Sequence, residues 1–224
     1  IGLHKEDVYY RKLDLQYTPL SFVGTYLHNE PFIEDLYKKR LEIKETGNSI
    51  LDSKYNAMGR LYPDMLSFRG NRYLFRSYLQ NDDRFLIHRH TIGPDDYLRE
   101  LDSFALNFSP NGAGEICFRD IEILGLGSAL FRQTLSYDFH NKLIPDYHYI
   151  AVDFLDLAEP LSMSNEEYWK LLADRVMEKF NKVKDDYEFI DFVAENGRKW
   201  YEKNGTAEAN AEIALNLINL DKLK

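Results

Sequence analysis

The chain has 224 residues, 44% hydrophobic content and a formal net charge of −9. That much apolar sequence can bury a core, so we expect a globular protein. The acidic balance argues against binding nucleic acid through its phosphates, which needs a basic face. One cysteine cannot form an internal disulfide, and the sequence shows neither a signal-peptide pattern nor an apolar run of about 20 residues. We therefore expect a cytoplasmic protein without a transmembrane segment.

The spacing of apolar residues alternates along the chain between the patterns of strands and helices. Asn29 and Pro31 mark a helix start, and the glycines of GLG mark a helix end at 125–127. In chain order we expect a strand over 19–26, a helix over 29–45, a strand over 84–90, a helix over 91–103, a strand over 103–109, a helix from Glu115, strands over 128–132 and 147–153, and helices from Asn165 onward.

The helices after Asn165 carry apolar stripes that we expect to be buried. The first stripe contains Trp169, Leu172, Val176 and Phe180, and the second contains Phe189, Phe192, Val193 and Trp200. Strands that alternate with helices of about ten residues favour a parallel sheet joined by right-handed crossovers. The fold class that we predict is α/β, with a Rossmann-like parallel sheet flanked by helices and a helical C-terminus.

The segment NGAGEICFRDIEILGLGSALFR, from Asn111 to Arg132, holds the candidate site. A helix that follows a glycine-containing loop offers unpaired N–H groups at its positive end, which suit phosphate oxygens. Arg119 can add a charged contact to a phosphate, and Glu122 can accept hydrogen bonds from a ribose. The alternative is that Glu115, Arg119 and Glu122 form an ordinary solvated face with spaced ion pairs.

Four segments, taken in order, resemble the donor-binding half of GT-B glycosyltransferases. The resemblance is greatest to the lipopolysaccharide-modifying family, which includes capsule-associated proteins and protein O-glucosyltransferases. The glycine loop and Arg-bearing helix form one segment, and PLSFVGTY with Arg40 downstream is similar to the strand and turn that begin this half. The other two are LIPDYHYIAVDFLDL (143–157), with Ala151 where a proline is usual, and FVAENGRKWYEKNGT (192–206).

This resemblance implies a glycosyltransferase that moves a sugar from a nucleotide-diphosphate donor, usually a UDP-sugar, to an acceptor hydroxyl of a glycan, lipid-linked or protein acceptor. It implies a metal-independent reaction with no cofactor besides the donor. Arg119 matches the arginine that contacts the diphosphate, whereas the catalytic base is not identified. The donor-binding residues that we predict are Gly24, Thr25, Arg40, Asn111, Gly112, Gly114, Glu115, Arg119 and Glu122.

The resemblance also implies a division of the chain. Residues 17–206 correspond to the nucleotide-sugar-binding domain, residues 1–16 to an N-terminal segment or linker, and residues 207–224 to a C-terminal helix. A complete GT-B enzyme has a second Rossmann-like domain that binds the acceptor, so we expect that domain upstream of Ile1. The other possibilities are a small domain made by residues 1–16 with the C-terminal helix, or a partner protein.

Two other interpretations stay open. The same fold can serve a nucleotide-sugar-binding or scaffold module without transfer activity. His88 and His90, two apart on an expected strand, suggest a metal-dependent oxygenase, with His140 and His148 as further candidate ligands. Cys117 lies on the apolar side of its expected helix, where a thiol is usually inert packing rather than a nucleophile.

Overall fold

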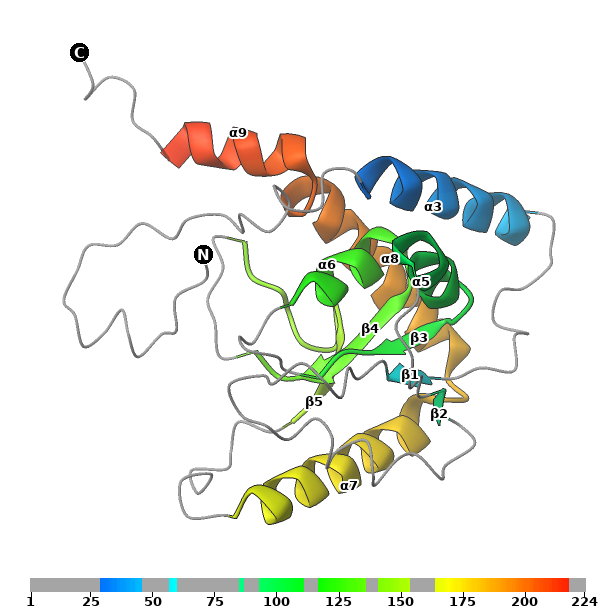
Figure 1. Ribbon diagram of the computed structural model, residues 1–224, viewed down its shortest axis with the longest axis vertical. Coiled ribbons are helices and arrows are strands. Elements are labelled where there is room, and N and C mark those ends of the chain that lie inside the picture. The colour runs from blue at the N-terminus through cyan, green and yellow to red at the C-terminus, as the bar shows by residue number, and fades with distance from the viewer. Residues whose placement is uncertain are drawn as a thin grey trace.

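The computed structural model describes residues 29–45, 57–59, 85–86, 93–110, 117–135, 141–153 and 164–217. Within these residues, five short strands form one parallel sheet in the centre of the molecule (Figure 1). The strands are β1 (Ala57–Gly59), β2 (Phe85–Leu86), β3 (Leu106–Phe108), β4 (Ala129–Gln133) and β5 (Ile150–Val152). The helices are α3 (Glu30–Glu45), α5 (Pro94–Asp102), α6 (Phe118–Gly125), α7 (Asn165–Val183), α8 (Tyr187–Asn204) and α9 (Ala207–Leu217).

The strand order is β2-β1-β3-β4-β5, and every neighbouring pair is parallel. The predicted α/β class with a parallel sheet is therefore confirmed. Since β2 lies on one side of β1 and β3 on the other, the winding direction reverses between β1 and β3. In open parallel sheets, ligands bind at the carboxyl ends of the strands beside such a reversal. The helix that follows β3 is α6, so the first turn of α6 lies at this place.

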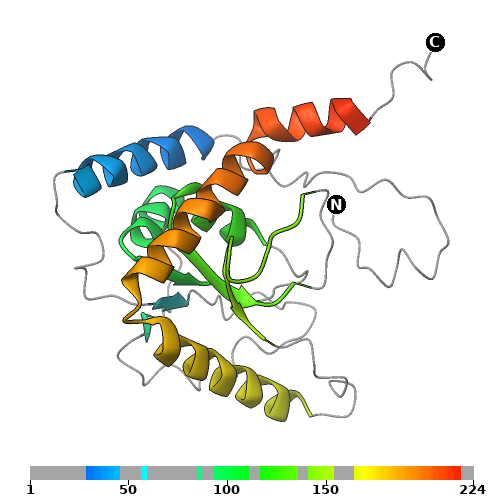
Figure 2. The same cartoon turned by 180° about the vertical axis from the view of Figure 1, so that it is seen from behind.

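Alternate residues of the strands supply two separate hydrophobic cores, as expected for a sheet that is covered on both faces. Phe108, Phe131 and Val152 belong to the core under α7 and the first half of α8. Leu130 and Ala151 belong to the other core, under α3, α5, α6 and the second half of α8. Figure 2 shows α8 crossing from the layer of α7 to the start of α9. This helix thus ties the two layers together.

Helix α6 ends where the two glycines of GLG predict. Leu126 is the C-cap, and Gly127 follows with a left-handed φ of 66°, which a residue without a Cβ adopts without strain. The Gly127 N–H donates to the carbonyl of Leu124 at 3.1 Å, and the Ser128 N–H donates to that of Ile123 at 3.2 Å. These two bonds make a Schellman motif, which satisfies the last carbonyls of α6 and turns the chain into β4.

The start of α6 differs from the sequence prediction. The helix begins at Phe118 rather than near Glu115, because Cys117 has extended backbone and acts as the N-cap. The alternative of an ordinary solvated face is also wrong for Arg119 and Glu122, the two of its three residues that the structure describes. Arg119 is 7% exposed and Glu122 is 5% exposed, because α3, α5, α8 and β4 all pack against α6. A helix enclosed in this way has no solvated side, so its charged residues lie inside the protein.

Of the two predicted apolar stripes, the one on α7 is confirmed and the one on α8 is partly wrong. Trp169, Leu172, Val176 and Phe180 of α7 are all buried. On α8, Val193 and Trp200 are buried, but Phe192 is 47% exposed and contacts the ring of Tyr147 instead. The buried side of α8 runs through Ile190, Val193, Ala194 and Gly197, at helical spacing of three or four residues. Phe192 falls between these positions and so points outward.

Gly197 allows α8 to approach the segment before β5 closely. A Cβ at this position would lie 2.7 Å from the carbonyl oxygen of His148 and 2.7 Å from the side chain of Leu124. Backbone cannot move aside as a flexible side chain can, so this contact requires a glycine. The closeness holds α8 against both α6 and the chain that leads into β5.

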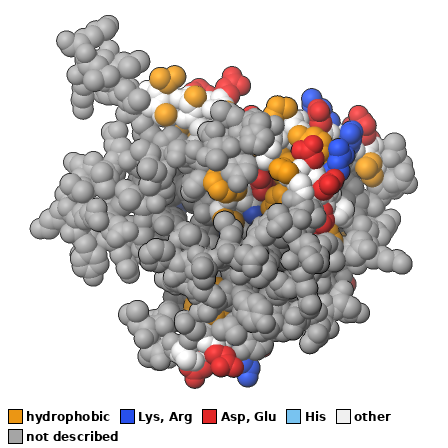
Figure 3. Space-filling view, in the orientation of Figure 1, with side chains coloured by type: hydrophobic (Ala, Val, Ile, Leu, Met, Phe, Trp, Pro, Cys, Tyr) orange, Lys and Arg blue, Asp and Glu red, His pale blue; other side chains and the backbone are white. Residues whose placement is uncertain are grey.

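The exposed side chains over α3 and α5 carry both signs of charge. Figure 3 shows acidic and basic groups side by side over these two helices. Such a mixed surface gives no single-sign field on this side of the molecule. None of the described helices combines the length and the apolar character that crossing a bilayer requires.

Candidate functional site

Arg119 occupies the first turn of α6, at the carboxyl end of β3. Its Nε donates a hydrogen bond of 3.3 Å to the hydroxyl of Tyr97 on α5. Its Nη1 is fully buried and has no acceptor among the described residues. A guanidinium is always charged, and an unpaired buried donor costs free energy. Arg119 therefore keeps a hydrogen-bonding capacity that the described residues do not use.

Glu122 lies one turn further along α6 and is 5% exposed. Burial raises the pKa of Glu122 from its usual 4.5 to about 7, and the nearby Tyr97 and the Arg119 charge offset only part of this rise. Burial also raises the pKa of Tyr97 well above its usual value, so the hydroxyl keeps its proton and can donate it to a carboxylate. Tyr97 thus contacts Arg119, the charged residue that the sequence places in the first turn of α6.

The residues around the helix start are fixed by short contacts. The Asp120 carboxylate accepts the N–H of Cys117 at 2.8 Å, which satisfies the N-cap donor. The thiol of Cys117 lies 3.3 Å from the hydroxyl of Ser109, the residue after β3. Burial, with a smaller contribution from the Asp120 charge, raises the pKa of the Cys117 thiol. A protonated, packed thiol is a poor nucleophile, as the sequence suggested.

A buried ion pair anchors this helix start to the sheet. Arg132 of β4 is 0% exposed, and its Nη1 donates to the Asp120 carboxylate at 2.5 Å. The Arg132 Nε also donates to the carbonyl of Gln133 at 3.1 Å. The second oxygen of Asp120, Oδ1, is buried without a donor among the described residues. Arg132 was not predicted as part of the site, because a single arginine in an apolar strand gives no sign of where its side chain points.

Arg40 was predicted to bind the donor together with Arg119, but its guanidinium lies at the opposite edge of the sheet. Its guanidinium donates to the carboxylate and the carbonyl of Asp102, to the carbonyl of Phe104 before β3, and to the carbonyl of Gly127 before β4, at 2.6 to 3.1 Å. These acceptors lie at the amino ends of the strands, the edge opposite to the first turn of α6. Such a set of contacts indicates that Arg40 links α3, α5 and the α6–β4 turn.

The other predicted donor-binding residues lie outside the described part of the chain. These are Gly24, Thr25, Asn111, Gly112, Gly114 and Glu115. The ends of the glycine loop are described, because Pro110 follows β3 and Cys117 caps α6. The loop between them therefore begins and ends at the carboxyl edge of the sheet, beside Arg119.

His148 has a structural contact, whereas the other candidate metal ligands, His88, His90 and His140, lie outside the described residues. Nδ1 of His148 accepts the N–H of Ile144 at 2.9 Å, which stabilises the turn before β5. Burial lowers the pKa of His148, which favours the neutral ring that this acceptor role requires. Among the residues that the structure describes, no three His, Cys, Asp or Glu side chains are grouped closely enough to hold a metal ion.

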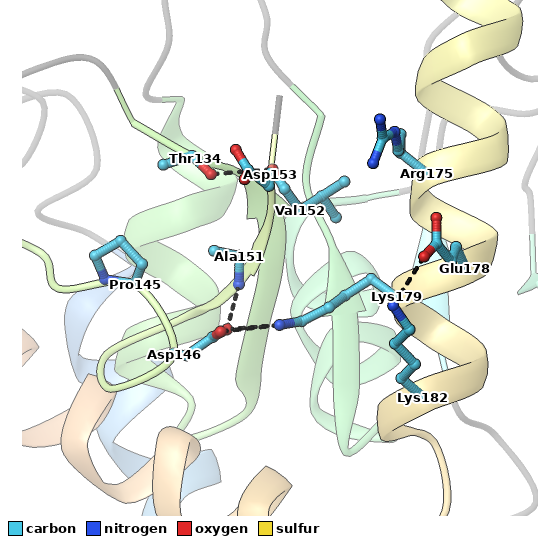
Figure 4. Close-up of a pocket in the computed structure, with 10 residues that line it drawn as sticks. All are labelled: Thr134, Pro145, Asp146, Ala151, Val152, Asp153, Arg175, Glu178, Lys179 and Lys182. Atoms are coloured by element: carbon cyan, nitrogen blue, oxygen red, sulfur yellow. Dashed lines mark hydrogen bonds and ion pairs between the residues drawn. The ribbon is translucent and has the colours of Figure 1, made fainter. Parts of the chain in front are cut away.

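A pocket of ≈ 430 Å³ lies along the edge strand β5, beside α7 (Figure 4). Asp146, at a left-handed φ of 54°, accepts the N–H of Ala151 at 3.0 Å and the ammonium of Lys179 at 2.9 and 3.0 Å. An edge strand exposes unpaired N–H groups, and Asp146 covers this one. The pocket is lined by Thr134, Pro145, Asp146, Ala151, Val152, Asp153, Arg175, Glu178, Lys179 and Lys182, none of which was predicted as a site residue.

Tyr97 and Asp120 are the further residues of the site that sequence reasoning missed. Tyr97 precedes Leu98 in a helix whose buried apolar positions are Leu98 and Leu101. Nothing in this pattern indicates that Tyr97 belongs to a site. Asp120 lies at the third helical position after the cap, where an acidic residue is typical of a capping interaction. That position was a usable signal for Asp120, whereas the contact between Tyr97 and Arg119 joins residues 22 positions apart.

A comparison of this sequence with protein-family models and with curated proteins finds no match. The resemblance of residues 17–206 to the donor-binding half of GT-B glycosyltransferases therefore stays a prediction, supported by the segments that carry it.

Proposed function

We propose that this chain is the donor-binding half of a glycosyltransferase and that it binds a nucleotide-diphosphate sugar, a UDP-sugar in the first instance. The observation that carries the proposal is the buried Nη1 of Arg119, which has no acceptor among the described residues and lies in the first turn of α6. A diphosphate oxygen supplies the missing acceptor and an opposite charge together. The position beside the reversal in strand order supports the same ligand.

In the proposed reaction, the bond between the sugar C1 and the diphosphate oxygen breaks, and the electron pair leaves with the diphosphate. The acceptor hydroxyl forms a bond to C1 and loses its proton. Negative charge therefore grows on the leaving diphosphate during the step. A fixed guanidinium at the positive end of a helix stabilises this charge without moving. Arg119 has that role in our proposal, and the Asp120–Arg132 pair holds the first turn in place.

The acceptor, a glycan, lipid-linked or protein hydroxyl, and the base that takes its proton are not assigned to described residues. In this proposal, the second domain expected from the family resemblance binds the acceptor and supplies the base. Gly24, Thr25 and the loop residues Asn111, Gly112, Gly114 and Glu115 remain candidates for the donor site. Glu122 remains a candidate for the ribose contact.

The test is a thermal-shift titration with UDP and a panel of nucleotide sugars, on the wild type, Arg119→Met and Arg175→Met. Arg175 is an exposed arginine of α7, so its replacement removes the same charge away from the site. A ligand present at 100 times its Kd stabilises a protein by about 2.7 kcal/mol. We expect this shift in the wild type and in Arg175→Met, and its loss in Arg119→Met.

No shift with any nucleotide would reject the proposal, and an equal shift in Arg119→Met would remove Arg119 from the site. A second assay measures UDP released from the donor sugar in the presence of acceptor sugars. Binding of the donor without such release supports the alternative of a nucleotide-sugar-binding module that does not transfer the sugar.

A further inference from the structure

The pocket between β5 and α7 lies away from the proposed donor site. Its volume of ≈ 430 Å³ is within the range of about 300–1,000 Å³ that is typical of small-molecule pockets. Strand β4 separates β5 from β3, and α7 covers the face of the sheet opposite to α6. The pocket is therefore distinct from the first turn of α6, where Arg119 lies.

Acidic and basic side chains line this pocket in equal number, and most of them are paired with one another. The Asp146 carboxylate accepts from the ammonium of Lys179 at 2.9 and 3.0 Å. Lys182 donates to the carboxylate of Glu178 at 2.8 Å. These two pairs cancel their own charges and leave one basic and one acidic side chain of the lining.

The two remaining charged side chains of the lining are Arg175 and Asp153. Neither makes a hydrogen bond or an ion pair within the part of the chain that the structure describes, and both are exposed. Figure 4 shows them on opposite sides of the cavity, Arg175 on α7 and Asp153 at the end of β5. The pocket thus presents a guanidinium donor and a carboxylate acceptor that a ligand can reach.

The open edge of β5 adds a backbone acceptor beside Asp153. The N–H and the C=O of one strand residue point to the same side, and successive residues alternate between the two sides. The carbonyl of Val152 accepts the N–H of Thr134 after β4 at 3.0 Å, whereas the N–H of Ala151 donates to Asp146. The carbonyl of Ala151 therefore points away from β4, on the side of the pocket that Ala151 lines.

The lining argues against several classes of ligand. None of the described residues that line the pocket has an aromatic ring, so a nucleobase or the face of a sugar ring has no stacking partner. The residues from α7 belong to its C-terminal half, where the helix dipole and the carboxylates of the lining oppose a simple anion. The basic side chains likewise oppose a simple cation. A small ligand that carries both charges matches the lining.

We propose that this pocket binds a free α-amino acid. The carboxylate of the ligand accepts from Arg175, and its ammonium group donates to the carboxylate of Asp153 and to the carbonyl of Ala151. Pro145 and Val152 supply apolar surface for the side chain of the ligand. This site does not depend on the proposed function, because it shares no residue with the donor site.

The experiment is calorimetric titration of the full chain at pH 7 with each of the standard amino acids. The wild type is compared with Arg175→Gln and Asp153→Asn, which remove one charge each from the pocket. The matched controls are Lys170→Gln and Asp174→Asn, because both residues are exposed charges of α7 that do not line the pocket. All four replacements are at exposed positions, so we expect every variant to fold.

We expect at least one amino acid to bind the wild type and the two controls with equal affinity. Arg175→Gln and Asp153→Asn should each bind it about tenfold more weakly, because a charge-assisted hydrogen bond is lost. Blocked forms of the same amino acid assign its two ends. Its amide lacks the carboxylate and should bind Arg175→Gln as it binds the wild type, and its N-acetyl derivative lacks the ammonium group and should bind Asp153→Asn as it binds the wild type.

Three outcomes would overturn the proposal. The first is that no amino acid binds the wild type, and the second is that the same affinity is found for Arg175→Gln and Asp153→Asn as for the wild type. The third comes from a parallel titration with inorganic phosphate. If phosphate binds, and its binding is lost in Arg175→Gln but kept in Asp153→Asn, the pocket is an anion site instead. Arg119→Met should bind the amino acid as the wild type does, so the result is independent of the UDP titration.

Discussion

Arg40 and Arg198 at the amino edge of the sheet differ from Arg119 at its carboxyl edge in how far the protein satisfies their guanidinium groups. At the amino edge, Arg40 makes four hydrogen bonds to Asp102, Phe104 and Gly127. Arg198 of α8 donates there to Glu34, Glu202 and the carbonyl of Gly125, and it lies over the ring of Tyr37. At the carboxyl edge, Arg119 makes one bond of 3.3 Å and leaves Nη1 unpaired within the described residues.

This difference separates arginines that stabilise the fold from one that is available to a ligand. A buried charge is costly unless hydrogen bonds and opposite charges compensate it. The amino-edge arginines are compensated by the protein. Arg119 and Glu122 are compensated poorly, and residues that break the rules of stability are concentrated at functional sites. We therefore expect replacement of Arg40 or Arg198 to lower the free energy of unfolding, and replacement of Arg119 or Glu122 to leave it unchanged or raise it.

The largest effect is expected for Arg40→Met, which should lower the free energy of unfolding by about 3–5 kcal/mol. The replacement removes a donor from the Asp102 carboxylate and from the carbonyls of Asp102, Phe104 and Gly127, of which Phe104 keeps the hydrogen bond from Ser128 Oγ. Urea unfolding measures the change. Arg99→Met is the matched control, because Arg99 is exposed on α5 and only lies over the ring of Phe32. A loss for Arg40→Met no larger than that for the control would contradict the structural role of Arg40.

Glu122→Gln should have an intermediate effect that depends on pH. The pKa of Glu122 rises on folding from 4.5 to about 7, so the folded state holds a proton that the unfolded state loses. Stability therefore falls as the pH rises from 4.5 to 7, and the cost at pH 8 is about 3 kcal/mol. Glutamine has no ionisable group, so the variant does not have this cost. The variant should be more stable than the wild type by up to that amount at pH 8, with no gain at pH 4.5, and an equal difference at both pH values would refute the assigned pKa.

The smallest effect is expected for Arg119→Met, which should change the free energy of unfolding by less than about 1 kcal/mol. Methionine fills the space of the arginine stem, and the replacement removes one long hydrogen bond together with an unpaired buried donor. Urea unfolding beside Arg40→Met gives the direct comparison of the two edges. A loss as large as that of Arg40→Met would show that Arg119 stabilises the fold after all.

The sequence predicted most of the element positions, because the signals are local. The apolar stripe of α7 and the GLG stop of α6 both act within a few residues, and each is present in the structure. The prediction that Phe192 is buried was wrong, because it is one of two adjacent apolar residues of α8 and only the other faces the core. The ring of Phe192 packs on Tyr147 outside the core. The start of α6 was misplaced because a cysteine cap gives no strong signal.

By itself the sequence determined the alternation of strands and helices, hence a parallel α/β sheet, and it predicts an anion site at the helix after β3. Only the tertiary structure decided what each arginine does. Arg40 and Asp102 are 62 residues apart, and Arg119 and Tyr97 are 22 residues apart, so no local pattern shows either contact. The fate of a buried charge depends on which acceptors the packed helices bring within reach, and this is set by the fold as a whole.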